Sequence, residues 1–374
     1  MVMADRPEVR TASGPVAAVT LMGLGENLVN ALARVPFGHP WHGPASVVQN
    51  TGANVTRQVI RSFMGYSTGL PIEEFRSMEG ALDGLCKVVL PPWVALRDGV
   101  SIETGVIGGV PGVWARPRKG SANGTILYLH GGGYIGTSPN MYAAFIGAMV
   151  GGTGCEVFVA DYRLAPEFPF PAGLDDAVDV YECLVASGVD PTTLIVAGDS
   201  GGGGLATSLI GELSDRDLPA PSALVLFSPE VDLDLNRPSV SENADRDILP
   251  WNIPVTSYLH GIHPDDARVS AVFADPAAYP PTFVALGSDE MFRDGILAFS
   301  ERLIEAGVSV EVHQEDAMFH VFPIVMPWAD AAKRVFASMD RFISRHVATS
   351  GSNTIGDAMD PRGSGSPEAS STQR

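Results

Sequence analysis

A glycine-rich pentapeptide, GDSGG at residues 198–202, constrains the fold of this chain more than any other feature. It follows an apolar run at 194–197 typical of a buried strand, and it precedes a helical pattern at 202–213. A serine on so sharp a strand-to-helix turn needs glycines on both sides, because the neighbouring chain packs closely there. The N-terminus of the following helix offers N–H groups and a positive dipole to a developing anion. The pattern therefore predicts that Ser200 is a nucleophile.

Other glycine-rich turns explain the same pentapeptide less well. A phosphate-binding loop would need Gly-Lys-Ser/Thr, and a dinucleotide-binding turn would need GxGxxG; residues 198–202 contain neither pattern. A turn with a purely structural role is the remaining alternative. The strand before it and the helix after it favour the nucleophile.

A second glycine run, HGGG at 130–133, directly follows the apolar run 125–129. Three consecutive glycines leave the backbone bare, so that its N–H groups can point at a substrate oxygen. The candidate donors of an oxyanion hole are the N–H groups of Gly131, Gly132, Gly133 and Gly201. Among the first three we favour Gly132 and Gly133 over Gly131. We expect His130 to orient this loop through hydrogen bonds and not to transfer protons.

Short apolar runs alternate with helical patterns through most of the chain. The expected strands lie at 113–115, 125–129, 156–160, 194–197, 223–227, 282–286 and 308–312, and the expected helices at 173–187, 202–213, 297–306 and 329–347. This alternation predicts an α/β fold with a mostly parallel sheet that helices cover on both faces. The interval 232–270 interrupts the alternation with Pro, Asn, Asp and aromatic residues, and we expect it to be an insertion.

The two ends of the chain differ from this middle part. Residues 1–95 show only short helical patterns, at 50–63 and 72–85, and the pair Pro91-Pro92 is expected to end them. The segment 349–374 is rich in Gly, Ser, Asn and Pro and is expected to be disordered. The predicted organisation is an N-terminal region 1–95, a core 96–348 and a tail 349–374.

Charge and cysteine content exclude several kinds of protein. With 43 acidic and 24 basic residues the net charge is −19, which argues against binding to nucleic acid or to an anionic membrane. Three scattered cysteines make neither a disulfide framework nor a metal site, so we expect no metal and a reducing compartment, the cytoplasm. The apolar stretch 15–24 is short and is interrupted by glycines, so neither a signal peptide nor a membrane span is expected.

Together the two glycine motifs resemble those of the hormone-sensitive-lipase family of esterases. Further landmarks that resemble this family are DYRLAPE at 161–167, FPA at 170–172, Pro281, the segment 287–295 and HVF at 320–322. The similarity runs from about residue 113 to 347. It implies an α/β-hydrolase fold with an eight-stranded sheet, a helical cap made by the N-terminal region and the insertion, and hydrolysis of short-chain esters or lactones without a cofactor. Gly201 departs from the family, in which alanine is more usual.

The base and the orienting acid of a triad are expected late in the chain. His320 is the best candidate base, because it lies after the last expected strand, in the order serine, acid, histidine of this fold. Two adjacent carboxylates, Asp289 and Glu290, compete to be the acid. The family pattern of an aspartate followed by Pro-Leu-Arg-Asp favours Glu290, because Arg293 and Asp294 then fall in place without a gap. Asp289 stays the alternative.

Three functions are compatible with these residues. The first is a carboxylic-ester hydrolase that acts through an acyl-enzyme on small, short-chain esters. The second is a lactonase or amidase with the same triad, since these differ in leaving group and pocket and not in mechanism. The third is a small-ligand receptor, because the family resemblance includes receptors that have lost the histidine; the presence of His320 opposes it. The sequence leaves the oligomeric state open, a homodimer included.

Overall fold

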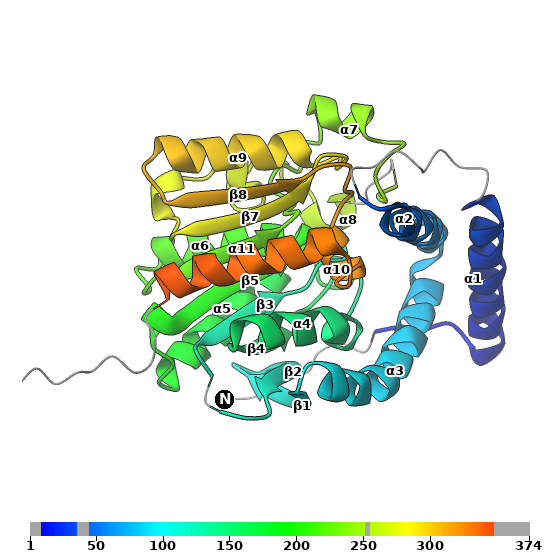
Figure 1. Cartoon of the computed structure of the whole chain (residues 1–374), viewed down its shortest axis with the longest axis horizontal. Coiled ribbons are helices and arrows are strands. Elements are labelled where there is room, and N and C mark those ends of the chain that lie inside the picture. Colours follow the sequence, from blue (N-terminus) through cyan, green and yellow to red (C-terminus); the bar gives the residue numbers. More distant parts are fainter. Residues whose placement is uncertain (1–8, 36–44, 121, 251–254, 348–374) are drawn as a thin grey trace, which may run out of the picture.

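An eight-stranded, mostly parallel sheet forms the centre of the molecule (Figure 1), as a computed structural model shows for residues 9–35, 45–120, 122–250 and 255–347. Its strands are β1 (Val100–Ile107), β2 (Val110–Pro117), β3 (Thr125–Leu129), β4 (Glu156–Ala160), β5 (Leu194–Asp199), β6 (Ala223–Phe227), β7 (Thr282–Gly287) and β8 (Val310–Glu315). They are arranged in the order β1-β2-β4-β3-β5-β6-β7-β8. Only the pairs β1–β2 and β2–β4 are antiparallel. The predicted fold class is confirmed.

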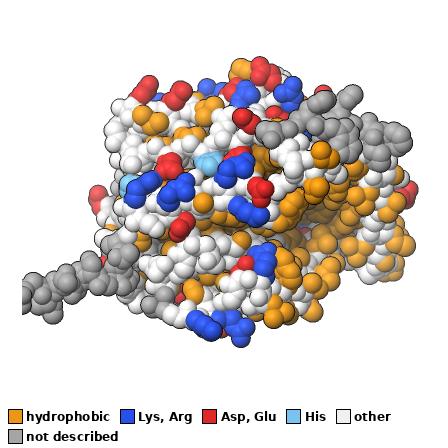
Figure 2. Space-filling model, viewed as in Figure 1, with side chains coloured by type: hydrophobic (Ala, Val, Ile, Leu, Met, Phe, Trp, Pro, Cys, Tyr) orange, Lys and Arg blue, Asp and Glu red, His pale blue; other side chains and the backbone are white. Residues whose placement is uncertain are grey.

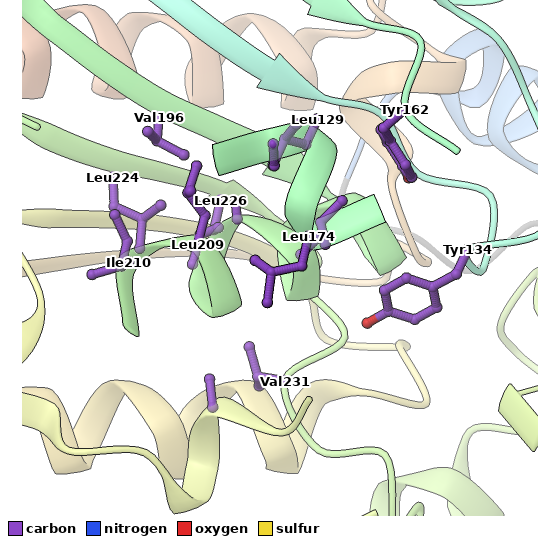
Figure 3. Packing of buried hydrophobic residues seen from close by; sticks show 14 of the residues in the cluster. Leu129, Tyr134, Tyr162, Leu174, Val196, Leu209, Ile210, Leu224, Leu226 and Val231 are labelled. Carbon is purple, nitrogen blue, oxygen red and sulfur yellow. The ribbon is translucent and has the colours of Figure 1, made fainter. Parts of the chain in front are cut away.

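Helices cover both faces of the sheet. One face packs on α5 (Ala172–Ala186), α6 (Ser200–Asp215) and α9 (Arg293–Glu305), and the other on α4 (Ala143–Thr153) and α11 (Asp330–His346). Because side chains alternate along a strand, Leu127 and Leu129 of β3 belong to the first core and Tyr128 to the second. Figure 3 shows part of the first core, where Leu209 of α6 lies near Leu226 of β6. Buried on both faces, the central strands are apolar throughout.

The sequence patterns missed strand β1. It is the edge strand, and its residues are mostly exposed or half-buried, so it lacks the apolar run of the central strands. A turn signal was nevertheless present: Gly108 and Gly109 join β1 to β2 with φ angles of 59° and 82°. Two residues with positive φ are what a tight hairpin turn requires.

The N-terminal region is more helical than predicted. It forms α1 (Gly14–Arg34), α2 (Val47–Ser67) and α3 (Ile72–Arg97). The prediction that Pro91-Pro92 ends the helical pattern was wrong, since α3 runs through both prolines. That part of α3 is open to solvent (Val88 is 72% exposed), so water can satisfy the carbonyl groups that lose their N–H donors.

Helix α1 also runs through Gly23 and Gly25, the glycines that interrupt the apolar pattern of the sequence there. A glycine weakens a helix by about 1 kcal/mol but does not end one that packs on a neighbour, and α1 packs on α2 and α3. By length and composition α1 alone, among the residues that the structure covers, could cross a membrane. Signal sequences and ordinary core helices pass the same test, so this finding does not establish a span.

Three arginines, here called the anchor arginines, fasten α2 and α3 to the core. Arg57 donates to the carbonyl of Ala317 at 3.3 Å, and Arg61 to that of Ala244 at 2.8 Å. Arg76, which is 7% exposed, binds both carboxylate oxygens of Glu167 at 2.7 and 3.0 Å. It also donates to the carbonyl groups of Ile135 and Ala165. These helices are therefore held by side chains that bond to segments distant in the sequence.

The outer faces of the same helices are apolar. Figure 2 shows hydrophobic side chains gathered on the side of the molecule formed by α1–α3, at the right of the view. The most exposed of them are Val19, Met22 and Val29 of α1, Val47 and Val48 of α2, and Leu85, Val88 and Leu96 of α3. The three helices therefore carry apolar residues on the outside as well as toward the core.

The interval 232–270 contains two short helices, α7 (Pro238–Glu242) and α8 (Val255–Leu259). Tyr258 of α8 stacks on Tyr134, with ring centroids 3.7 Å apart, and its carbonyl accepts the N–H of Phe170 at 2.9 Å. Short elements elsewhere are the turns η2 (Pro139–Tyr142), η3 (Pro191–Thr193), η4 (Ala271–Phe273) and η5 (Pro276–Ala278) and the helix α10 (Phe322–Val325). The expected disordered tail, 349–374, lies outside the described residues.

Candidate active site

Ser200 is the first residue of α6 and directly follows β5, as the pentapeptide predicted. Its φ angle of 51° is rare for a residue with a side chain. The glycines are needed for packing: a Cβ on Gly202 would overlap the carbonyl oxygens of Leu129 and His130. A Cβ on Gly198 would lie 2.5 Å from the carbonyl oxygen of Gly202. The strained turn and its glycines thus present the Ser200 hydroxyl at the end of the sheet.

His320 lies beside this hydroxyl, with its Nε2 2.8 Å from Ser200 Oγ. It comes from the loop between β8 and α10 and is 2% exposed. Its backbone N–H donates to Asp247 Oδ1 at 2.8 Å, and the ring of Phe292 meets the imidazole edge-on at 5.0 Å. His320 is therefore held both by its backbone N–H and by the packing of its ring.

The structure brings Glu290, and not Asp289, to the other side of the imidazole. Glu290 is fully buried, and its Oε2 faces Nδ1 of His320 at 3.5 Å. Its Oε1 accepts hydrogen bonds from Ser228 Oγ at 2.6 Å and from the N–H of Gly287 at 2.5 Å. Asp289 instead points to Arg57 of α2, at 3.6 Å. The separation of 3.5 Å is longer than that of an ordinary hydrogen bond.

The charge of Glu290 affects the proton affinity of His320. Burial is the largest single influence and lowers the pKa, because it disfavours the imidazolium. The facing carboxylate of Glu290, together with those of Asp247 and Glu230, raises the pKa by more than burial lowers it. The pKa of His320 consequently lies above its ordinary value of 6.5. This environment favours a histidine that accepts a proton from Ser200.

The glycine loop lies against the same turn. Gly132 and Gly133 have φ angles of 117° and 60° and line the cavity in front of Ser200. Gly201 packs so closely on them that a Cβ there would lie 3.3 Å from the nitrogen of Gly133. The N–H of Gly131 is engaged elsewhere, because it donates to Asp199 Oδ1 at 2.9 Å and to Tyr142 Oη at 3.0 Å. Of the four candidate donors, Gly131 is thus the one that the structure directs away from the cavity.

His130 is buried in the core and is not near the reacting groups. Its Nδ1 lies 3.0 Å from the carbonyl oxygen of Gly131 and 2.9 Å from the hydroxyl of Thr137, and its ring stacks on Tyr162. Burial lowers the pKa of His130 to about 4. A neutral imidazole with these partners holds the glycine loop in shape.

Two buried aspartates that the sequence analysis did not single out support the site. Asp199 accepts hydrogen bonds from Tyr128 Oη, Tyr142 Oη and the N–H of Gly131, so it ties the serine turn to the glycine loop. Asp247 accepts the backbone N–H groups of Ile248, Met291 and His320. Burial raises the pKa of both aspartates to about 6. Asp199 had a signal, its place inside the motif, whereas Asp247 in the insertion had none.

A cavity of about 320 Å³ opens in front of these groups. Its walls are mostly apolar and come from α2, α3, the glycine loop and the segment before residue 251. The wall residues from α2 and α3 are Ile60, Phe63, Met64, Ser67, Phe75, Met78, Glu79 and Leu82. Helix α1 contributes none of them. Within the described ranges no cluster of His, Cys, Asp and Glu has the form of a metal site.

Known proteins similar to this chain share one family and one kind of name. A family model described as alpha/beta hydrolase fold matches residues 126–324. An esterase of Acinetobacter venetianus is 32% identical over 271 residues, which span 71% of this chain and 88% of that protein. An acetyl-hydrolase of Streptomyces hygroscopicus is 32% identical over 234 residues, 62% of this chain and 78% of that protein.

A solved structure described as a hormone-sensitive lipase from a metagenome library is similar over 78% of this chain and 99% of its own. Its TM-score is 0.69 and its sequence is 32% identical. The resemblance that the motifs indicated is therefore present in both sequence and structure.

Proposed function

Because the chain belongs to this α/β-hydrolase-fold family, with the hormone-sensitive-lipase type among its relatives, we propose that it is a serine carboxylesterase that forms an acyl-enzyme at Ser200. One observation carries the proposal. The hydroxyl of Ser200 is 2.8 Å from Nε2 of a buried histidine, and a buried carboxylate faces that histidine's other nitrogen. Nucleophile, base and orienting acid in this sequence of contacts are what acyl transfer requires.

The roles follow from the contacts. His320 takes the proton of Ser200 as its oxygen attacks the ester carbonyl, and Glu290 stabilises the imidazolium that forms. The N–H groups of Gly132, Gly133 and Gly201 are the proposed donors to the oxyanion. His320 then returns the proton to the leaving alcohol, and a water molecule, deprotonated in the same way, releases the acid and regenerates Ser200.

The cavity suggests the kind of substrate. A mostly apolar space of about 320 Å³ suits a small ester with a short acyl chain, and the acetyl-hydrolase among the relatives supports this choice. We propose that residues 1–95 and the insertion 232–270 act as a cap that walls the acyl site over a core of residues 96–348. Trp251, an aromatic candidate for this wall, lies outside the described residues.

Removing the nucleophile tests the function. Replacing Ser200 by alanine should lower p-nitrophenyl butyrate hydrolysis by several orders of magnitude, because only binding and oxyanion contacts remain. A fluorophosphonate probe should label the parent protein and not the variant. Ser208→Ala is a matched control in the same helix, since that hydroxyl donates only to the carbonyl of Gly204, away from the cavity. Equal labelling of Ser200→Ala and the parent would reject the assignment, and faster hydrolysis of the matched anilide would favour an amidase.

We propose the cytoplasm as the location of the protein. Cys86, Cys155 and Cys183 are all free thiols, which suits a reducing compartment. Fractionation of producing cells, with activity measured in each fraction, would test this placement.

A further inference from the structure

Glu230 lies in the cavity wall beside the reacting groups and takes no part in the mechanism above. It follows β6, is 1% exposed, and its backbone N–H donates to the carbonyl of Ser200 at 2.9 Å. Its Oε1 is buried and has no hydrogen-bond partner anywhere in the described chain. Leaving such a group unsatisfied destabilises the folded protein, so a buried acceptor kept in this state needs an explanation.

Two tyrosine hydroxyls near Glu230 are buried in the same way. The hydroxyls of Tyr134 and Tyr258 are also buried and, among the described residues, have no partner. Both tyrosines are close enough for the charge of Glu230 to add to burial in raising their pKa values. The wall of the cavity is largely apolar, so the carboxyl of Glu230 is one of its few polar groups.

Glu230 differs from the other acids near the site. Asp199, Asp247 and Glu290 each accept at least two hydrogen bonds from protein donors. Glu79, also in the cavity wall, binds Arg76 through Oε2 at 2.8 Å. No arginine or lysine of the described ranges forms an ion pair with Glu230. Burial raises its pKa to about 7, and the nearby His320 opposes this effect. Near neutral pH its carboxyl can therefore accept a hydrogen bond from a ligand, and part of the population can donate one.

We propose that Glu230 determines substrate specificity by accepting a hydrogen bond from a donor group, a hydroxyl or a protonated amine, that the ester carries near its reacting carbonyl. The inference rests on the proposed esterase function and narrows its substrates to small esters with a polar substituent. An ester without such a group leaves the carboxyl of Glu230 unsatisfied when it fills the cavity, and should therefore react less well.

Pairs of esters of equal size test the proposal. A pH-stat assay compares ethyl 3-hydroxybutyrate with ethyl 3-methylbutyrate, and 2-hydroxyethyl butyrate with propyl butyrate; these pairs test a hydroxyl on the acyl and the alcohol side. A third pair, 2-(dimethylamino)ethyl butyrate and 3-methylbutyl butyrate, tests a protonated amine. In at least one pair the parent protein should show a higher kcat/KM for the member with the donor. Glu230→Leu should lower the ratio of kcat/KM for the ester with the donor to kcat/KM for its partner by about 10-fold, because one buried hydrogen bond is lost.

Two further variants make the result specific. Glu230→Gln keeps the shape and an acceptor oxygen, so it should retain the preference for a hydroxyl and lose the preference for an amine. If Glu230→Leu does not fold, this variant alone tests whether Glu230 binds the donor group. Met78→Leu changes the apolar wall and should leave the donor-to-isostere ratios unchanged.

Other outcomes overturn the inference. Ratios near one in the parent for all pairs would do so, and so would an equal loss for both members of every pair, which indicates that Glu230 only positions His320. If p-nitrophenyl butyrate is still hydrolysed and fluorophosphonate still labels Ser200, the esterase function stands and only the role of Glu230 fails. If the parent shows neither reaction, the proposed function itself fails.

Discussion

Asp199 and Asp247 are buried carboxylates, like Glu290, but they bind backbone N–H groups around the site and not the imidazole. Asp199 joins the serine turn to the glycine loop, and Asp247 collects N–H groups from three separate segments, that of His320 among them. Each is a buried acceptor whose hydrogen bonds offset the cost of burial. The backbone geometry around Ser200 and His320 therefore depends on these two carboxylates.

The pH dependence of activity tests the role of Glu290. Only neutral His320 can accept the proton of Ser200, so kcat/KM should rise with pH through the pKa of His320, with a midpoint above 6.5. Replacing Glu290 by glutamine removes the charge that raises this pKa, so the midpoint should move to lower pH. Turnover should also fall, by up to about 10⁴-fold, by analogy with the amide substitution in a serine protease.

Asp289→Asn is the control for this experiment. Asp289 faces Arg57, so its amide should keep the midpoint and most of the activity. A crippled Asp289→Asn beside an active Glu290→Gln would show that the acid is the other of the two neighbours. pH profiles of kcat/KM for the three proteins decide between them.

Sequence patterns indicated the proposed catalytic residues better than the residues that support them. Ser200 and His320 stand in motifs whose chemistry needs them, and the structure brings the two side chains together. The choice between Asp289 and Glu290 depended on a one-residue shift, which only the three-dimensional arrangement can resolve. Asp247 and Glu230 had no local signal, because what distinguishes them is burial among segments far apart in the chain.

At the scale of elements, helix α6 combines two kinds of glycine. Gly202 lies under the serine turn, where a side chain would meet the backbone of Leu129 and His130. Gly211, near the end of the same helix, has open space at its Cβ position. One glycine is needed for close packing and the other only weakens the helix.

Alanine at these two positions should have opposite effects on stability. Gly202→Ala should lower the free energy of unfolding by about 1–3 kcal/mol or more, because backbone must move to admit the methyl group. Gly211→Ala should raise it by about 0.4–1 kcal/mol, because it restricts the unfolded chain without a clash. Urea unfolding followed by circular dichroism measures both changes. A Gly202→Ala protein as stable as the parent would mean that the turn is looser than described.

The elements that the sequence predicted well are those buried on both sides. Strands β3, β4 and β6 have the predicted bounds, since an apolar run between polar turns leaves little choice. Strand β1 and the second half of α3 lie at the surface, where the pattern of burial is weak and solvent tolerates prolines and polar residues. Prediction from the sequence pattern failed in elements that are not buried on both sides.

For the whole molecule, the cavity depends on helices far from the motifs in sequence. Phe63 of α2 is half-buried in the cavity wall, and replacing it by alanine should enlarge the acyl site. We expect the ratio of kcat/KM for p-nitrophenyl octanoate to that for the acetate to increase by up to about 10-fold. The positions of Ser200 and His320 should change little.

Val88→Ala supplies the comparison, because Val88 lies on the exposed face of α3 and is absent from the cavity wall. Its chain-length preference should equal that of the parent. An unchanged preference in Phe63→Ala would argue that α2 is only added core and that the cap does not select substrates.

The anchor arginines allow the pocket to change separately from the chemistry. Each reaches out of α2 or α3 to a backbone carbonyl of another segment, an acceptor that no side-chain substitution removes. The same helices also carry Ile60, Phe63 and Met78, which line the cavity wall. In the course of divergence, a chain built in this way can exchange those wall residues one at a time while the helices stay docked. One reaction centre can thereby serve a succession of different substrates.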